Sequence, residues 1–98
     1  MPPALPAVLR EHSDVLQRIA VEHGIIKLRV FGSSVQGPLT APRDIDLLVV
    51  LAPGRDLVDL VAFKLEAERL LGRQVDVAEE EGLSPYLREK ILAEAVPL

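Results

Sequence analysis

The stretch that most limits the fold is residues 44–51, which read Asp-Ile-Asp-Leu-Leu-Val-Val-Leu. Apolar residues fill both alternating sets of positions from residue 47 onward, which is typical of a central strand covered on two faces. Asp44 and Asp46 stand at the start of this strand and share one face. Neighbouring carboxylates against apolar surface repel each other and lose hydration, so burying them is costly unless a cation or protons join them. A divalent metal that also binds a phosphate is the expected occupant.

Composition limits the chain to one small domain and excludes several kinds of site. The 98 residues suffice for a single core, so we expect one domain over residues 1–98. The chain has no cysteine, which excludes disulfides, thiolate metal sites and cysteine nucleophiles. The net charge of −4 argues against a general binder of nucleic-acid backbones, although a single mononucleotide needs only a few local donors. No apolar run is long enough to span a bilayer and no signal-peptide pattern opens the chain, so the expected location is the cytoplasm.

Hydrophobic periodicity and turn residues divide the chain into helices and strands. Apolar residues at helical spacing predict a helix that begins near residue 5 and ends at Gly24. A second helix over residues 57–71 is predicted between Asp56 as its N-cap and Gly72 as its stop. Ser84 followed by Pro85 predicts the start of a third helix, whose apolar residues are expected to face inward: Leu87, Ile91, Leu92 and Ala95. Strands are predicted over residues 25–31, 44–51 and 74–78.

The order of these elements predicts an α+β fold with a three-stranded mixed sheet in the order 1-2-3, flanked by helices. The long helix between the second and third strands is typical of a parallel crossover. The loop between the first and second strands allows either sense. An antiparallel first strand is favoured on functional grounds, because it gathers the following residues at one end of the sheet: Gly32, Ser33, Asp44, Asp46 and Asp76.

Three acids beside a Gly-Ser turn predict a site for a metal-bound nucleotide. Magnesium takes oxygen ligands, and three carboxylates can hold two such ions. One ion would bind a triphosphate, and the other would lower the pKa of an attacking hydroxyl. Asp76 would be a ligand or the general base, although an acid at a strand end is, taken alone, more often an ordinary exposed residue. Gly32 would let the backbone approach a phosphate, and the Ser33 hydroxyl would donate to it.

Three runs of the sequence resemble a known family. They are Val-Phe-Gly-Ser at residues 30–33, Asp-Ile-Asp-Leu-Leu-Val at residues 44–49, and Leu-Ser-Pro-Tyr-Leu-Arg-Glu-Lys-Ile-Leu at residues 83–92. With the later strand Asp76, they are similar to the minimal nucleotidyltransferases (MNT) of the DNA polymerase β-like nucleotidyltransferase superfamily. The resemblance runs from residue 30 to residue 98 and implies the nucleotidyltransferase fold.

The resemblance also implies roles and a partner. Gly32 and Ser33 would contact the nucleotide, and Asp44, Asp46 and Asp76 would be metal ligands and catalytic residues. Proteins of this kind are usually the antitoxin of a pair with a HEPN-domain ribonuclease toxin. The implied reaction is magnesium-dependent and moves AMP from ATP to a tyrosine hydroxyl of that toxin.

Three positions depart from the pattern of the family and leave alternatives to the implied function open. Many relatives have arginine in place of Ser34 and Gln36 and serine in place of Arg43. Arg43 either contacts the nucleotide, pairs with an acid and competes with metal, or lies in water. A non-catalytic antitoxin that neutralises its partner by docking is therefore the alternative to an enzyme. A transferase for small molecules is a third hypothesis, but relatives of that kind use a second domain for the acceptor.

The middle helix carries more apolar surface than one core face requires. One stripe at helical spacing consists of Leu60, Phe63, Ala67, Leu70 and Leu71, and a second consists of Leu57, Val58, Val61 and Leu65. Such a helix is either deeply buried or docked to another chain. The terminal helices cover both stripes in the first case, and a protein partner covers the second stripe in the other.

Overall fold

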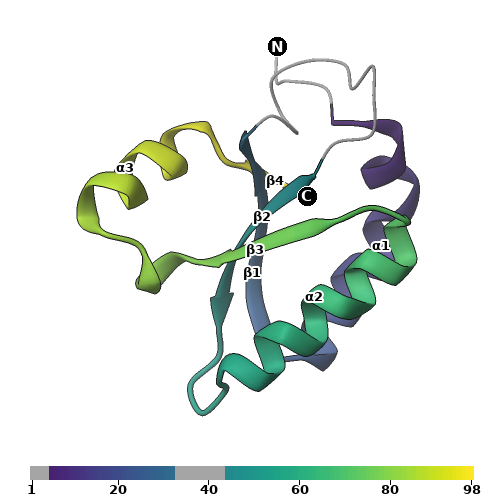
Figure 1. Ribbon diagram of the computed structural model, residues 1–98, viewed down its shortest axis with the longest axis horizontal. Helices are drawn as coiled ribbons and strands as arrows, with labels where there is room; N and C mark the ends of the chain where they lie inside the picture. Colours follow the sequence, from purple (N-terminus) through teal and green to yellow (C-terminus); the bar gives the residue numbers. More distant parts are fainter. Residues whose placement is uncertain (1–4, 33–43) are drawn as a thin grey trace.

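The strands of this protein form one mixed sheet, with helices placed on either side. The computed structural model describes residues 5–32 and 44–98 (Figure 1). Its elements are α1 (Ala7–Glu22), β1 (Ile25–Phe31), β2 (Ile45–Leu51), α2 (Leu57–Leu71), β3 (Val75–Glu79), the 3-10 helix η2 (Glu80–Gly82), α3 (Pro85–Glu94) and β4 (Val96–Pro97). Within the described residues the strand order is β3-β2-β1-β4, with β1 antiparallel to both of its neighbours and β2 parallel to β3. The predicted α+β class and the order and sense of the first three strands are confirmed.

The prediction of a three-stranded sheet was wrong, because β4 adds a fourth strand to the sheet formed by the described residues. This strand pairs antiparallel with β1 through Arg29 opposite Pro97 and Val30 opposite Val96. A strand of two residues is too short to produce a period-two pattern, and its proline cannot donate a ladder hydrogen bond. The proline suits β4 to the edge of the sheet, and the short length of the strand leaves no pattern from which it could be predicted.

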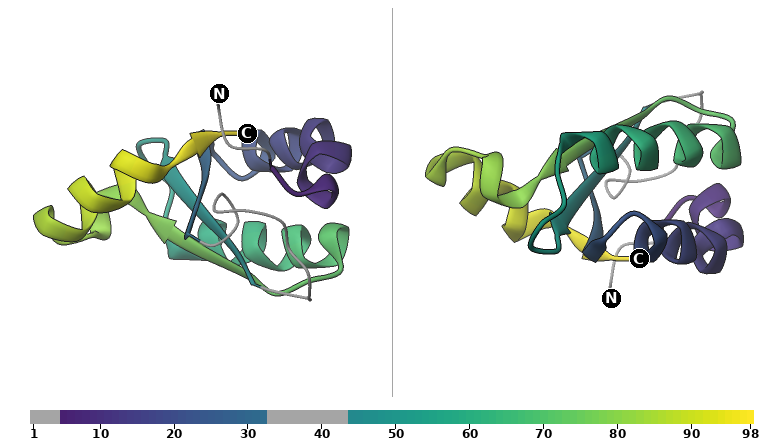
Figure 2. Two further views of the ribbon diagram at one scale, coloured as in Figure 1. Left: turned by 90° about the horizontal axis from the view of Figure 1, so that it is seen from above. Right: turned by 90° about the horizontal axis from the view of Figure 1, so that it is seen from below.

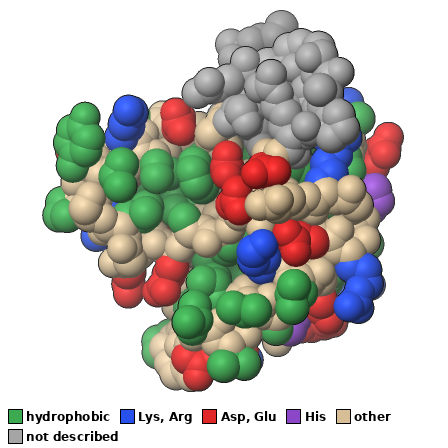
Figure 3. All heavy atoms as spheres, viewed as in Figure 1, with side chains coloured by type: hydrophobic (Ala, Val, Ile, Leu, Met, Phe, Trp, Pro, Cys, Tyr) green, Lys and Arg blue, Asp and Glu red, His purple; other side chains and the backbone are tan. Residues whose placement is uncertain are grey.

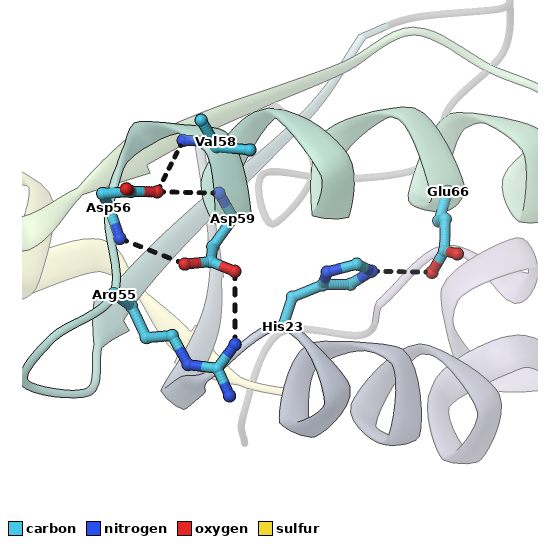
Figure 4. A network of polar contacts seen from close by, with 6 residues as sticks. All are labelled: His23, Arg55, Asp56, Val58, Asp59 and Glu66. Carbon is cyan, nitrogen blue, oxygen red and sulfur yellow. Dashed lines mark hydrogen bonds and ion pairs between the residues drawn. The ribbon is translucent and has the colours of Figure 1, made fainter.

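The bounds of α2 are set by its caps. Asp56 accepts hydrogen bonds from the amides of Val58 at 3.0 Å and Asp59 at 3.4 Å, and the Asp59 carboxylate accepts one from the Asp56 amide at 3.1 Å (Figure 4). This reciprocal capping box satisfies amides that the first turn leaves unpaired. At the other end Gly72 adopts φ 67°, the left-handed conformation that ends a helix. Both caps were predicted, and both are confirmed.

Helices α1 and α2 lie on the same side of the sheet and enclose the core with it (Figure 2). The helices are also joined at their surface by a hydrogen bond between His23 Nε2 and Glu66 Oε2 at 3.0 Å (Figure 4). The fully buried side chains of largest volume are Phe63, Leu9, Leu16, Ile45, Leu47, Leu48, Val30, Val49 and Val75. Because α2 contributes Phe63, Ala67 and Leu71 to this core, its first predicted stripe faces the sheet.

The second stripe of α2 faces away from the core. Leu57, Val58, Val61 and Leu65 are 68%, 74%, 45% and 54% exposed. With Ala62 they line a shallow apolar hollow of about 410 Å³ on the outside of the helix. The terminal helices therefore do not cover both stripes, and an apolar surface remains on this side of the protein.

Helix α3 stands apart from the layer formed by α1 and α2, on the other side of the sheet (Figures 1 and 2). None of its residues is buried. The prediction that Leu87 faces inward was wrong, since its side chain is 46% exposed, while Ile91 and Leu92 are half-buried. Within residues 5–32 and 44–98, no helix has the length and apolar character needed to cross a membrane.

Candidate active site

Strand register brings the predicted turn and two of the predicted acids to one end of the sheet. The antiparallel pairing of β1 and β2 places Phe31 opposite Asp46, and the parallel pairing of β2 and β3 places Asp46 opposite Asp76. Gly32 follows Phe31, so the end of β1 lies beside the starts of β2 and β3. Opposite residues of paired strands project to the same face, and Asp46 therefore lies between the Gly32 turn and Asp76.

Gly32 is required by the backbone and by the space around it. Its φ is 71°, in the left-handed region that residues with a side chain adopt only at a cost. A Cβ built on Gly32 would collide with Oδ2 of Asp46 and lie 3.2 Å from Asp46 Cγ. The Asp46 carboxylate thus packs directly over the backbone of the turn, and only glycine permits this approach.

Asp46 is a carboxylate in an unfavourable environment. Its pKa is raised, mainly because burial removes water from the charged form, and further because of the negative charges of Asp76, Asp44 and Glu94. Asp46 is half-buried, whereas Asp44 and Asp76 are exposed. Acidic side chains gather near the middle of the face shown in Figure 3. A cation placed among these groups would relieve both the repulsion and the lost hydration.

The donor set fits magnesium. Among the described residues, no group of three acidic or histidine side chains lies close enough together to hold a metal ion by itself. Magnesium in phosphate-handling sites usually takes one or two carboxylates and completes its shell with substrate oxygens and water. The oxygens of Asp46 and Asp76, on adjacent strands in register, match this requirement.

One acid of the site, Glu94 at the end of α3, was not predicted from the sequence. Its Oε1 accepts a hydrogen bond from the Gly32 amide at 3.3 Å, and its charge contributes to the raised pKa of Asp46. Glu94 is separated from Gly32 by 62 positions in the sequence. Spacing carried no signal for it, because only the packing of α3 brings its last turn to the end of β1.

The start of β3, and with it Asp76, is held in place by Glu68 of α2. Glu68 Oε2 accepts hydrogen bonds from the Val75 amide at 3.0 Å and from Lys64 Nζ at 3.0 Å. These contacts, the backbone bond first, lower the pKa of Glu68. The Ile45 amide also donates to the Gln74 carbonyl at 3.0 Å, which joins the first residues of β2 and β3. Asp46 and Asp76 therefore sit on a fixed pair of strand ends.

The remaining predicted nucleotide contacts, Ser33 and Arg43, lie outside the described residues, as do Ser34 and Gln36. Gly32, Asp44, Asp46 and Asp76 are described, and the structure brings them to the same end of the sheet. The arrangement supplies a backbone donor in a glycine turn, adjacent oxygen ligands for a divalent cation, and an exposed acid on the neighbouring strand. These are the parts needed to bind a metal-bound nucleoside triphosphate and to accept a proton beside it.

Comparison with known sequences gives matches over most of the chain. The nucleotidyltransferase domain family matches residues 9–98. A candidate protein adenylyltransferase of Methanocaldococcus jannaschii is 40% identical over 78 residues, which cover 80% of this chain and 84% of that protein. The protein adenylyltransferase MntA of Thermococcus cleftensis is 27% identical over 92 residues, which cover 94% of this chain and 90% of that protein.

Comparison with solved structures agrees. A candidate minimal nucleotidyltransferase has a TM-score of 0.83 and 43% identity, with 92% of each chain covered. A complex of tri-AMPylated HEPN toxin with MNT antitoxin from Shewanella oneidensis gives a TM-score of 0.69 at 16% identity, covering 90% of this chain and 69% of that chain, and shows the same fold. This chain belongs to the nucleotidyltransferase domain family.

Proposed function

We propose that this protein is a magnesium-dependent adenylyltransferase that moves AMP from ATP to a tyrosine hydroxyl of a HEPN-domain toxin and so acts as its antitoxin. The observation that carries the proposal is the position of Asp46, between the Gly32 turn and Asp76 in strand register. Relatives named as protein adenylyltransferases, and a similar fold found in HEPN toxin–MNT antitoxin complexes, support the choice of acceptor and partner.

In the proposed site the residues hold the metal ions, orient the phosphates and accept a proton. Asp44, Asp46 and Asp76 would hold two magnesium ions, which supply charge neutralisation to the triphosphate and acidity to the attacking hydroxyl. The Gly32 amide and the Ser33 hydroxyl would orient the phosphates, and Arg43 would add a positive charge beside Asp44. The hydroxyl oxygen attacks the α-phosphorus, the bond to the β-phosphate oxygen breaks and pyrophosphate leaves. Asp76 would accept the hydroxyl proton.

The outer surface of α2 supports the involvement of a protein partner. The hollow lined by Leu57, Val58, Val61, Ala62 and Leu65 is almost wholly apolar, and no other described segment of the chain covers it. Exposed apolar surface of this kind marks protein interaction sites. We assign this surface to the docking of the toxin, whose tyrosine then completes the acceptor side of the reaction.

The proposal is tested by incubating the protein with ATP and a purified HEPN-domain toxin. Mass spectrometry is expected to show AMP on a tyrosine of that protein when magnesium is present and to show none with a chelator. Asp46→Asn is expected to lose both ATP binding and transfer. Asp76→Asn is expected to lose transfer more than binding, because Asp76 lies on the strand beyond the Gly32–Asp46 pair.

Three results would overturn parts of this proposal. The metal site is contradicted if the protein binds ATP equally with and without chelator. It is also contradicted if Asp46→Asn binds ATP as tightly as the wild type does. A toxin that is neutralised while no AMP is attached to it shows the alternative function, an antitoxin that acts by docking alone.

A further inference from the structure

The contact between Gly32 and Glu94 occupies a backbone donor that the proposed function assigns to a phosphate. Glu94 Oε1 accepts from the Gly32 amide at 3.3 Å. Gly32 ends the strand opposite Asp46 and opens the glycine turn, where a left-handed φ of 71° turns the chain. A glutamate carboxylate and a phosphate oxygen are both anionic acceptors, and one N–H group at this position serves one of them at a time.

The position of Glu94 also opposes a nucleotide electrostatically. Its carboxylate is close enough to Asp46 to contribute to the repulsion at that residue. A triphosphate that approached the Gly32 amide would meet this negative charge as well as the aspartates. Magnesium offsets the charge of the aspartates, which can ligate it, whereas Glu94 is hydrogen-bonded to the turn itself.

Glu94 lies two residues before Val96, which pairs with β1, so its release from the Gly32 amide is a movement of the side chain. Helix α3 itself has few buried contacts: none of its residues is buried, and Tyr86 and Leu87 are exposed. At its first turn, Arg88 Nε lies 4.0 Å from Glu80 Oε1, and the Arg88 side chain is 48% exposed. Few buried apolar contacts and exposed polar contacts are the features of segments that move at low cost.

We propose that Glu94 competes with the nucleotide: its carboxylate holds the Gly32 amide in the nucleotide-free protein and is displaced when a triphosphate binds to the turn. This inference rests on the proposed function, since it concerns the same nucleotide site. It makes Glu94 a residue that limits nucleotide affinity.

The test compares Glu94→Ala, Glu94→Gln and the wild-type protein, with Glu89→Ala as the control. Glu89 is an exposed acid of the same helix, so its replacement changes net charge and helix composition equally. Calorimetric titration with magnesium ATP is expected to show affinity about three- to tenfold higher for Glu94→Ala, the range for loss of one competing hydrogen bond. Glu94→Gln keeps an acceptor without the charge, and its affinity is expected to lie between those of Glu94→Ala and the wild type. The affinity of Glu89→Ala is expected to match that of the wild type.

A second measurement examines the contact without any nucleotide. Hydrogen exchange of the Gly32 amide, followed by NMR, is expected to be faster in Glu94→Ala than in the wild type and unchanged in Glu89→Ala. If the Gly32 amide exchanges equally in Glu94→Ala and the wild type, the competition does not exist.

The titration separates the failure of this inference from the failure of the proposed function. If the wild type and Glu94→Ala bind magnesium ATP equally, or Glu94→Ala binds it more weakly, only the competition is wrong. Weaker binding identifies Glu94 as a group that assists the nucleotide. If neither protein binds magnesium ATP at millimolar concentration, the proposed function is wrong and the competition is wrong with it.

Discussion

At the scale of single residues, the central contact of the site is between the Asp46 carboxylate and the backbone of Gly32. Asp46 packs over the turn so closely that no side chain fits on Gly32. Burial is the main reason for the raised pKa of Asp46. A residue kept in an unfavourable state is a mark of a functional site, because selection for stability alone would replace it.

Gly32→Ala is expected to lower the free energy of unfolding by more than the about 1–2 kcal/mol that a left-handed conformation costs alanine, because its Cβ also displaces the Asp46 carboxylate, and to lose most of the affinity for magnesium ATP. Denaturant unfolding and calorimetric titration measure the two effects. Gly54→Ala is the matched control, since Gly54 has φ 87° and no atom within 4 Å of a built Cβ. It is expected to carry the same backbone cost and to bind the nucleotide normally. Normal binding by Gly32→Ala would show that the turn does not carry the nucleotide.

Asp46→Asn is expected to raise the stability of the nucleotide-free protein. A carboxyl whose pKa is raised by folding binds its proton more tightly in the folded state, so its charged form destabilises the fold at neutral pH and this effect disappears as pH falls through the raised pKa. Asparagine removes the charge at every pH. Unfolding at pH 7 is the measurement, with Asp14→Asn on the exposed face of α1 as the control. A less stable Asp46→Asn protein would contradict this account of the site.

At the scale of secondary-structure elements, the site depends on how α2 is joined to the sheet. Glu68 contacts the first amide of β3 and Lys64 of its own helix, so one carboxylate fixes the end of a helix against the start of a strand. Asp76 is the next residue of that strand. The capping box at the other end of α2 fixes the beginning of the same helix.

Glu68→Ala is expected to destabilise the protein at neutral pH and to flatten its loss of stability in acid. Because the folded state lowers the pKa of Glu68, its contribution is complete above the ordinary value of 4.5 and is lost as pH falls through the lowered value. Unfolding measured from pH 7 down to acid tests this, with Glu11→Ala on exposed α1 as the control. Equal acid dependence of Glu68→Ala and the wild type would show that Glu68 does not hold β3.

At the scale of the whole molecule, α2 has one side in the core and the other in contact with solvent. Phe63 is fully buried between the helices and the sheet, while Val58 and Leu65 are more than half exposed. A free-standing domain gains nothing from such a surface, whereas a domain that docks another protein does. The helix therefore has a structural side and a proposed binding side.

The free energy of unfolding of the double variant Val58→Gln and Leu65→Gln is expected to lie within about 0.5 kcal/mol of the wild-type value, because both side chains are exposed. The double variant is expected to lose binding to the HEPN-domain partner. Denaturant unfolding and pull-down with the purified partner measure these effects. Phe63→Ala is the contrasting variant and is expected to cost about 3–5 kcal/mol. If the double variant keeps its partner, docking uses another surface, and if it unfolds, the stripe belongs to the core.

The sequence by itself determined the elements and much of the predicted site, because these depend on local chemistry. Gly72 ends α2 by its left-handed φ, and the Asp56 capping box starts it, as their residue types predict. The apolar run after Asp46 predicted a central strand, and the helix that follows predicted a parallel neighbour, whereas the register that sets Asp76 opposite Asp46 came from the pairing of β2 with β3. Local rules of this kind act within a few residues and are therefore visible in the sequence.

Three features depend on tertiary structure alone: the pairing of β4 with β1, the exposure of α3 and the contact of Glu94 with the Gly32 amide. The two residues of β4 are too few to show a pattern, and its pairing is decided by the free edge of β1. The apolar residues of α3 predicted burial, but no layer of the described fold covers that helix fully. Glu94 contacts a residue 62 positions away, and the energy of such a contact depends on how whole elements pack, which no local pattern records.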